Sequence, residues 1–478
     1  MSKLLQFLLF NLFIFGFLNC QKQKTDPDEL KFQFSNGNFR IANQIIEEIK
    51  SSGFPENQSG EIEIIEAKIE RIQLDFSKTE SQIKDELSPW FPNVTNEQLR
   101  RWEEDKTLEM KVIDGERRYF KNAVSNLFRL NPEAKKVKES KEGELVDLLD
   151  TFRLANTSEL LDKVNKEVNL LEEPHKYRIE FTISLEPDVI PAGEIVKCWM
   201  PFPRESLPRQ KNVNLISVNT ENYILADNKN MQRSLYLEKT TEAGKPTIFI
   251  YTAEFETSPQ YFKIQPNKFE TYNKESEDYR KYTAERLPHI VFTDEIKELT
   301  AKVTSGISNP FEKVKAIYYW INSNVTWASA LEYSTFECIP EYVLNTRHGD
   351  CGMQTLLFMS MARYAGIPCK WQSGWMLHSG HLNLHDWCEV YYEGTGWVPL
   401  DQSFGLQKSE NQQLKEFYIS GIDEFRLIVN DEFCCELEPK KKYFRSEPID
   451  FQRGELEWKG ENIYFNHWDY HLDVTSIK

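Results

Sequence analysis

Three residues in the second half of the chain carry the side chains that a thiol acyl-transfer enzyme needs. Cys351, His385 and Asp401 supply a thiol, an imidazole and a carboxylate in that order. In such enzymes the thiol attacks as a thiolate, the imidazole moves the proton, and the carboxylate orients the imidazole. The three residues therefore predict catalysis through a covalent acyl-cysteine.

The pattern around Cys351 predicts a helix that begins at the thiol. Asp350 stands where an N-cap is expected, the pattern runs to Ala365, and Gly366 and Pro368 end it. The unpaired N–H groups and the dipole of a helix N-terminus favour an anion, so we expect this position to lower the pKa of the thiol. The same N–H groups are placed to stabilise the oxyanion of a tetrahedral intermediate.

His385 and Asp401 lie at the far ends of two predicted strands. The strands cover residues 387–392 and 397–400, and the segment Gly394–Gly396 supplies a tight turn between them. An antiparallel pairing centred on that turn sets residue i near residue 790 − i. We therefore expect the imidazole and the carboxylate to lie side by side with a small stagger.

Residues about 285–405 resemble the transglutaminase-like superfamily, whose core has a papain-type Cys–His–Asp triad. The matching segments are Arg347-His-Gly-Asp-Cys351, Ala362-Arg-Tyr-Ala-Gly-Ile-Pro368, His385-Asp-Trp387 and Gly396-Trp-Val-Pro-Leu-Asp401. The resemblance implies that Cys351 is the nucleophile, that His385 is base and acid, and that Asp401 orients the imidazole.

Some members of the superfamily use an upstream aromatic or amide side chain to assist the oxyanion. Trp327 is the candidate for this role, although core packing is the interpretation that the sequence favours for it.

Two other interpretations of these residues stay open. Cys351 can be a buried inert thiol, the usual fate of a lone cysteine. The spacing of His378, His381 and His385 is compatible with metal ligation. That spacing would place all three side chains on one face only if the segment were a helix, and Gly380 and the flanking strands argue against a helix. We expect no metal and no cofactor.

The predicted fold is multidomain α+β. Residues 29–175 show charged, helical periodicity, and from Tyr177 the period changes to two. Short strands separated by turn residues then predict a β-sandwich module over 176–265. The transglutaminase-like core follows at 285–405, and residues 406–478 form a C-terminal extension.

The N-terminus has the pattern of a signal peptide of the lipoprotein type at residues 1–19. Leu4–Leu18 is almost wholly apolar, and Cys20 is the residue that would be lipidated, although Asn19 stands where a small residue is usual. Residues 20–28 form a polar tether. We expect an exported protein with a lipid anchor in the bacterial cell envelope, at the outer membrane or in the periplasm. A plain secreted protein and an uncleaved anchor are the alternatives.

The composition and the predicted chemistry together limit the possible partners and reactions. The formal net charge of −17 over 478 residues argues against nucleic acid as a partner, because phosphate binding needs a basic face. We expect a protein or peptide substrate and contact with a membrane through the N-terminal lipid. The predicted activity is hydrolysis or transamidation of peptide or glutamine-type amides. The alternative is a non-catalytic envelope scaffold or binding lipoprotein with an inactive transglutaminase-like domain.

Overall fold

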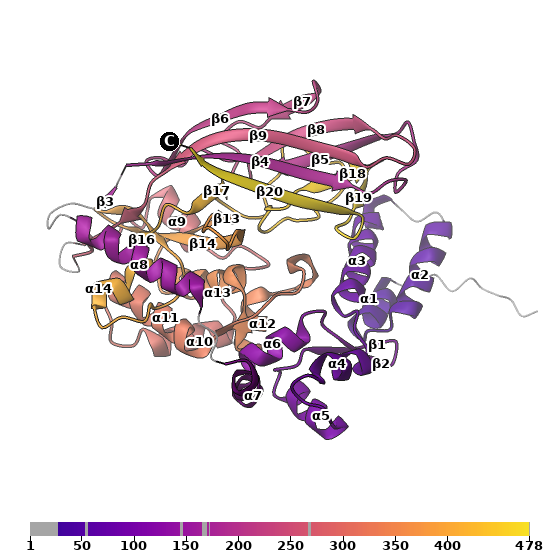
Figure 1. The fold of residues 1–478 in the computed structure, drawn as a ribbon, viewed down its shortest axis with the longest axis horizontal. Helices are drawn as coiled ribbons and strands as arrows, with labels where there is room; N and C mark the ends of the chain where they lie inside the picture. The colour runs from indigo at the N-terminus through magenta and orange to yellow at the C-terminus, as the bar shows by residue number, and fades with distance from the viewer. Residues whose placement is uncertain are drawn as a thin grey trace, which may run out of the picture. The chain divides into compact units, whose positions relative to one another are not determined.

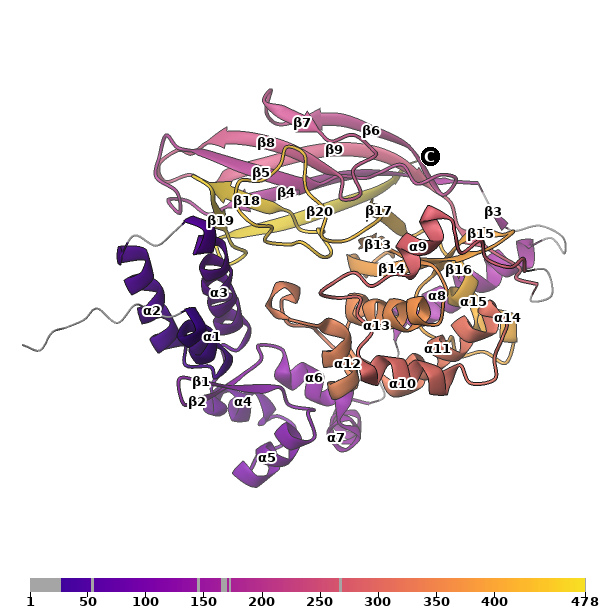
Figure 2. The same ribbon diagram turned by 180° about the vertical axis from the view of Figure 1, so that it is seen from behind.

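The computed structural model describes residues 27–52, 56–143, 147–164, 170–171, 173–265 and 269–477. The predicted signal segment and Cys20 lie outside these residues, so the lipid anchor stays a prediction. Among the described residues, no helix is both long enough and apolar enough to cross a membrane. Figures 1 and 2 show the chain from opposite sides.

The backbone divides into two units, which are described separately. The first comprises residues up to Glu70 and the segment Val112–Arg117. Its elements are α1 (Pro27–Ser35), α2 (Phe39–Ser52) and most of α3 (Glu56–Asp75). Gly37 turns the chain between α1 and α2 at φ 73°, and a Cβ there would lie 2.3 Å from the Val112 carbonyl oxygen. The apolar stripes of these helices are buried at Ile45, Ile46, Ile49, Ile62, Ile65 and Ile69.

The second unit holds the rest of the chain, and its first part is mainly helical, as predicted. Asn and Asp side chains cap two of its helices: Asn131 accepts hydrogen bonds at the start of α7, and Asp147 does so at the start of α8. Strands β1 (Met110–Ile113) and β2 (Glu116–Tyr119) form a two-stranded sheet whose outer ends belong to this unit and whose turn, Val112–Arg117, belongs to the first. The helices are α4 (Glu80–Leu87), α5 (Asn96–Glu104), α6 (Ala123–Leu130), α7 (Pro132–Glu142) and α8 (Leu148–Lys163).

A β-sandwich of two antiparallel sheets follows. The predicted alternation starting at Tyr177 forms strand β4, whose residues 177, 179, 181, 183 and 185 all face the sandwich core. The strands from this part of the chain are β4 (His175–Leu185), β5 (Ile195–Pro201), β6 (Gln210–Val218), β7 (Tyr223–Leu225), β8 (Ser234–Thr240) and β9 (Thr247–Thr257).

Strands from the C-terminus complete both sheets of the sandwich. β20 (Trp468–Ile477) pairs with β4 along its full length, and β18 (Glu455–Trp458) pairs with β5 and with β19 (Glu461–Ile463). The sheet orders are β20-β4-β9-β6 and β19-β18-β5-β8-β7. The sandwich is thus larger than the predicted 176–265 segment, because the C-terminal extension folds back onto it.

The core sheet has the order β15-β14-β13-β17. Its strands are β13 (Cys369–Met376), β14 (Asn383–Tyr392), β15 (Gly396–Leu400) and β17 (Arg426–Asn430). Helix α13 (Cys351–Tyr364) packs on one face, together with Cys388, Val390 and Tyr392 of β14. Trp387 packs on the opposite face with Ile422 and Ile428. The two faces of β14 therefore have different surroundings.

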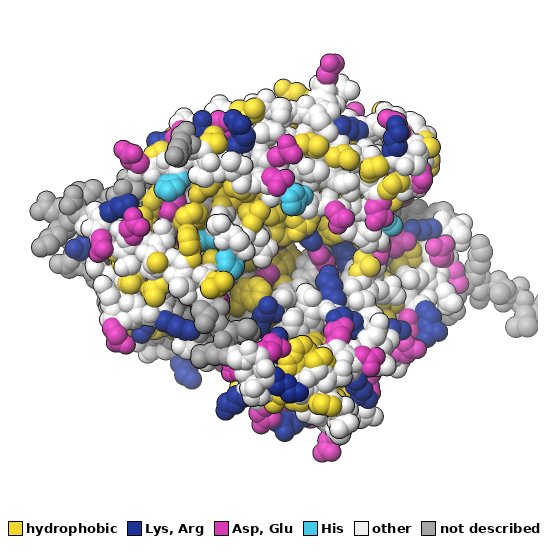
Figure 3. Space-filling model, viewed as in Figure 1, with side chains coloured by type: hydrophobic (Ala, Val, Ile, Leu, Met, Phe, Trp, Pro, Cys, Tyr) yellow, Lys and Arg dark blue, Asp and Glu magenta, His cyan; other side chains and the backbone are white. Residues whose placement is uncertain are grey.

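Further elements surround this sheet. The helices are α9 (Glu277–Thr283), α10 (Asp294–Val303), α11 (Pro310–Asn324), α12 (Ile339–Thr346), α14 (Gln412–Lys415) and α15 (Phe417–Ser420), with a 3-10 turn at Tyr333–Thr335. Short strands pair as β16-β10-β3 and as β11-β12. Their bounds are β3 (Leu170–Leu171), β10 (Gln260–Tyr261), β11 (Thr326–Trp327), β12 (His348–Gly349) and β16 (Gly421–Ile422). Figure 3 shows acidic and basic side chains interspersed over one face of the described residues.

Candidate active site

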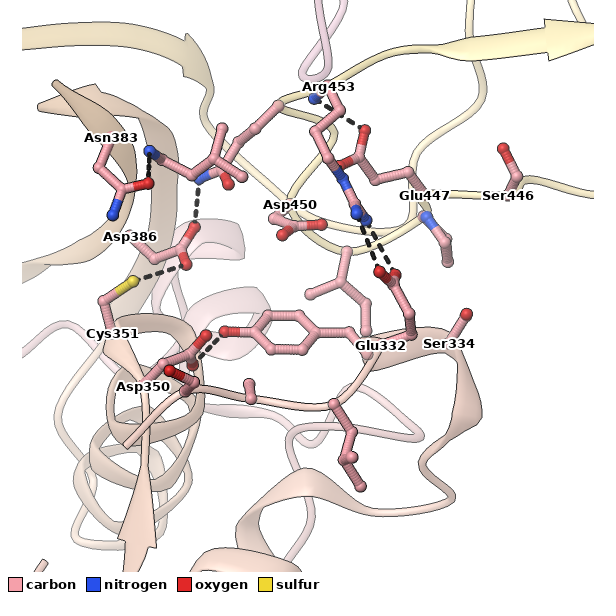
Figure 4. Close-up of a pocket in the computed structure, with 18 of the residues that line it drawn as sticks. Glu332, Ser334, Asp350, Cys351, Asn383, Asp386, Ser446, Glu447, Asp450 and Arg453 are labelled. Carbon is pink, nitrogen blue, oxygen red and sulfur yellow. Dashed lines mark hydrogen bonds and ion pairs between the residues drawn. The ribbon is translucent and has the colours of Figure 1, made fainter. Parts of the chain in front are cut away.

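Cys351 is the first residue of α13, as the sequence predicts. The Asp350 side chain caps the helix by accepting a hydrogen bond from the Met353 N–H, and Gly366 turns the chain after the helix at φ 81°. The thiol is 9% exposed and lies in the wall of a cavity of about 370 Å³ (Figure 4). The helix start therefore presents Cys351 to a space that a substrate can enter.

The polar partner of the thiol is Asp386. The Cys351 thiol donates to Asp386 Oδ2 over 3.3 Å, and the Gln452 side-chain amide donates to Asp386 Oδ1 over 2.7 Å. The same amide also donates to the backbone oxygen of His385, over 2.9 Å. Asp386 lies in the segment His385-Asp-Trp387, and the sequence pattern predicted no role for it.

His385 and Asp401 lie together, as predicted. His385 Nε2 is 2.6 Å from Asp401 Oδ2, and both side chains are buried. The β14–β15 pairing sets residue i opposite residue 788 − i, in place of the predicted 790 − i. The shift of two residues keeps both side chains on one face, because strand side chains alternate with a period of two.

The structure does not join Cys351 to the imidazole. Asp386 projects to the α13 face of β14, and the alternation places the preceding His385 on the Trp387 face. In the described part of the chain, no hydrogen bond links the Cys351 thiol to His385; the thiol bonds to Asp386 instead. The predicted triad is thus present as two pairs, Cys351–Asp386 and His385–Asp401.

Burial decides the ionisation of the thiol. It raises the pKa of Cys351 well above its ordinary value, and the neighbouring carboxyl groups of Asp386 and Asp350 raise it further. The expected lowering by the helix N-terminus is therefore wrong for this conformation. The partial positive charge at the helix N-terminus stabilises a thiolate only modestly. Burial of a thiolate away from water and beside two carboxyl groups opposes ionisation much more strongly.

The His385–Asp401 pair is held by a buried cation. Arg426 Nη2 lies 3.0 Å from Asp401 Oδ2 and 3.5 Å from Asp423 Oδ2, and its side chain is fully buried. Burial lowers the pKa of His385; Arg426 adds to this effect and Asp401 opposes it. Burial would raise the pKa of Asp401, but His385 and Arg426 together hold it below its ordinary value. The imidazole is therefore neutral and its partner ionised near neutral pH.

The cavity beside Cys351 is rich in carboxyl groups. Arg453 forms a two-pronged ion pair with Glu332, both bonds measuring 2.9 Å, and a further pair with Glu447 at 2.8 Å. Figure 4 shows the Asp450 carboxyl between Asp386 and Arg453. The sequence pattern did not predict that the loop before β18 contributes to this cavity, because only the tertiary structure brings that distant segment next to Cys351.

Trp327 also lies in the cavity wall, on β11, which runs parallel to the segment just before Cys351. Its side chain is 40% exposed, so the favoured prediction that Trp327 packs in the core is wrong. The Arg129 guanidinium carbon lies 5.0 Å from the centre of its ring. The indole is thus placed on the same side of β14 as the thiol.

The three histidines of the metal alternative have separate surroundings. His378 Nε2 lies 3.3 Å from Asp423, whereas His385 contacts Asp401. Across the described ranges, no group of three or more His, Cys, Asp or Glu side chains is arranged to hold a metal ion. The seven described cysteines, which include Cys351, are free thiols.

Comparison with known proteins places this core in a family. Residues 297–402 match the model of the transglutaminase-like superfamily, and this range contains Cys351, His385 and Asp401. Residues 297–402 are a transglutaminase-like domain. The uncharacterized protein YebA of Bacillus subtilis (strain 168) is 26% identical to this chain over 148 residues, which are 27% of this chain and 20% of YebA. The matched part thus spans about a fifth of the length of that relative.

Three solved structures are similar to parts of this chain. A candidate cysteine protease from Cytophaga hutchinsonii has a TM-score of 0.45 at 16% identity, covering 65% of this chain and 93% of that one. The periplasmic domain of TgpA from Pseudomonas aeruginosa has a TM-score of 0.28 at 12% identity, covering 53% and 98%. A candidate protease from Parabacteroides distasonis has a TM-score of 0.22 at 12% identity, covering 56% and 49%.

Proposed function

We propose that this protein catalyses thiol-dependent acyl transfer on peptide or glutamine-type amides. The observation that carries the proposal is the position of Cys351, which begins a helix at the wall of a cavity within a transglutaminase-like domain. The acyl group passes from the substrate amide to the thiol and then to water or to a second amine. Hydrolysis and transamidation share these steps and differ in the final acceptor.

The proposed reaction needs a base for the thiol proton. His385 takes that proton as the sulfur attacks the substrate carbonyl carbon, and the same proton then passes to the leaving nitrogen as the carbon–nitrogen bond breaks. In the second half of the cycle, His385 takes a proton from water or an amine, and the thiol is restored. Since the thiol donates to Asp386 and the imidazole lies on the opposite face of β14 in the described conformation, the first step requires a rearrangement that brings the sulfur and the imidazole together.

Other residues support the charges that develop in this scheme. Asp401, ion-paired with Arg426, stabilises the imidazolium form of His385. The N–H groups of the first turn of α13 and the indole N–H of Trp327 are the proposed donors to the oxyanion. Asp401 and Arg426 thus act on the imidazole, whereas Trp327 acts on the substrate oxygen from the cavity wall.

The test uses the purified protein with a peptide library, with and without a labelled primary amine. Mass spectrometry separates cleavage and deamidation from amine incorporation. We expect Cys351→Ala to abolish every product while the melting temperature stays within a few degrees, and Cys434→Ala, which changes an exposed free thiol, to retain activity. Products that persist in Cys351→Ala would disprove the role of the thiol. A parent protein without any product would favour the scaffold alternative.

We also propose that the chain is exported and attached to the bacterial envelope through lipid on Cys20. The apolar segment before Cys20 and the polar tether after it support this proposal. Metabolic labelling with an alkyne fatty acid is expected to mark the parent and not Cys20→Ala. Equal labelling of both proteins would refute it.

A further inference from the structure

Asp386 has an arrangement that the proposed triad does not use. Its carboxyl group lies in the cavity wall, is 2% exposed and has one oxygen 3.3 Å from the reactive sulfur. A group bonded to that sulfur would come within reach of this oxygen. The distance therefore places Asp386 at the reacting atoms and not at a remote structural position.

The two carboxyl oxygens of Asp386 have different surroundings. Oδ1 accepts the Gln452 amide N–H over 2.7 Å, and Gln452 is itself buried and held by its second hydrogen bond, to the His385 backbone oxygen. Oδ2 faces Cys351 and the cavity (Figure 4). Because Oδ1 already accepts an N–H, a proton on this carboxyl group belongs on Oδ2, the oxygen that faces the sulfur.

The surroundings of Asp386 favour its neutral form. Burial raises the pKa of Asp386 well above its ordinary value, and the charges of Asp450 and Asp350 raise it further. Arg453 is already paired with Glu332 and Glu447. The ionisable groups that face Asp386 come from α13, the 3-10 turn and the loop before β18: Asp350, Cys351, Tyr333, Glu447, Asp450 and Arg453.

We propose that Asp386 Oδ2 donates a hydrogen bond to the carbonyl oxygen of the acyl group that forms on Cys351. Asp386 is then a catalytic residue of the oxyanion site, in addition to the helix N–H groups and Trp327. The inference rests on the proposed acyl transfer. When the rearrangement that brings the sulfur to His385 breaks the contact with Asp386, Oδ2 is released from the sulfur and is left facing the oxygen of the bound substrate.

The proposed step leaves the proton on Asp386 throughout. As the sulfur–carbon bond forms, the carbonyl π electrons move to oxygen, and the Oδ2–H group stabilises that charge without transferring its proton. The oxygen returns to a carbonyl when the leaving nitrogen departs with the proton carried by His385. Removing one donor of this kind lowers kcat by roughly 100- to 1,000-fold in other acyl-transfer enzymes.

Two substitutions separate donation from the other roles of this carboxyl group. Asp386→Asn keeps a donor, its amide nitrogen, in the place of Oδ2, and we expect kcat/KM within about tenfold of the parent at pH 6. Asp386→Ala removes the donor, and we expect a loss of roughly 100- to 1,000-fold. Asp450→Asn is the matched control, because it changes a carboxyl of the same cavity that, among the described residues, makes no hydrogen bond to the Cys351 thiol.

The pH profile gives a readout that a structural role would not move. Activity of the parent is expected to fall at high pH as Asp386 loses its proton, and Asp386→Asn is expected to lack that fall. Asp450→Asn removes a charge that raises the pKa of Asp386, so the fall should move to lower pH. This second comparison stays decisive if Asp386→Ala does not fold.

Several results would overturn the inference. Asp386→Ala within tenfold of an active parent would show that no donor is needed. Asp386→Asn as inactive as Asp386→Ala, at an unchanged melting temperature, would show that the carboxyl group transfers a proton instead. A high-pH fall shared by the parent and Asp386→Asn would assign that fall to another group. No turnover by the parent would remove the proposed function, and this inference with it.

Discussion

The buried Arg426 offers a sharp test of how the His385–Asp401 pair is maintained. Its guanidinium bridges two carboxylates that are almost inaccessible to solvent, Asp401 at 3.0 Å and Asp423 at 3.5 Å. Removing one partner from a buried charge network costs about 3–5 kcal/mol in the free energy of unfolding, because a charge is left uncompensated. We therefore predict that Arg426→Gln strongly destabilises the core.

The remaining contacts set the expected size of the effect. Asp401 would keep His385 at 2.6 Å and the Phe404 N–H at 3.1 Å. Asp423 would keep the Tyr418 hydroxyl, which donates over 2.9 Å, and His378 at 3.3 Å. Both carboxylates therefore stay partly compensated, and we expect a loss near the lower end of the range, about 3 kcal/mol.

The same substitution should change the titration of His385. Arg426 lowers the pKa of His385, so its removal is expected to raise that pKa and increase the imidazolium fraction near neutral pH. Urea unfolding measures the stability, and NMR of isotope-labelled histidine measures the titration. Arg178→Gln is the matched control, because Arg178 pairs with Glu254 at the surface and is 52% exposed, where a pair contributes about 0–1 kcal/mol.

Two results would refute this reasoning. A loss of stability in Arg426→Gln no larger than in Arg178→Gln would mean that the buried network is not held by this cation. An unchanged His385 titration would mean that the guanidinium charge does not reach the imidazole.

Three further predictions follow from the same structure. Iodoacetamide should modify the exposed Cys434 before the buried Cys351 at pH 7. Burial raises the pKa of both thiols, that of Cys434 to about 11, so exposure decides the order and both rates should rise at alkaline pH. Peptide mass spectrometry measures both rates, and modification of Cys351 first at pH 6–7 would contradict its burial and its raised pKa. Burial raises the pKa of Glu424 to about 7, above its unfolded value of 4.5, so the stability that depends on its neutral form is complete below pH 4.5 and is lost as pH rises through 7. Glu424→Gln should therefore gain up to about 3 kcal/mol over the parent between pH 5 and pH 8.5, and a pH-independent difference would count against the shift. Gly374→Ala should lower the free energy of unfolding in urea by about 3 kcal/mol or more, because its Cβ would lie 1.9 Å from the Leu427 carbonyl oxygen. Gly60→Ala, in an open helical position, is the control and should raise that free energy by about 0.5–1 kcal/mol. Equal effects of the two substitutions would contradict the close packing of β13 on β17.

Local chemistry explains the parts of the fold that the sequence predicted. The Asp350 cap and Gly366 define α13 through hydrogen bonds and backbone angles within a few residues. The β14–β15 hairpin follows from its glycine turn, and the predicted register differs by two because the loop closes between Tyr392 and Gly396. Since this difference is even, the prediction that His385 lies beside Asp401 holds despite the shift.

The extent of the sandwich could not be predicted in the same way. Strand β20 alternates weakly between buried and exposed positions, and its partner β4 lies nearly 300 residues earlier in the chain. Nothing local specifies a pairing over such a separation. The same holds for Gln452 and Arg453, which reach the cavity from the loop before β18.

The sequence by itself determined which chemical groups the domain contains, where α13 begins, and that the imidazole lies on one strand of a hairpin while the carboxylate directly follows the other, because each depends on neighbours a few residues away. Tertiary structure alone decided that the thiol meets Asp386 and not His385, and that burial overrides the helix N-terminus in setting the thiol pKa. The physical reason is that consecutive strand residues face opposite sides of a sheet, and that the cost of ionising a group depends on everything packed around it.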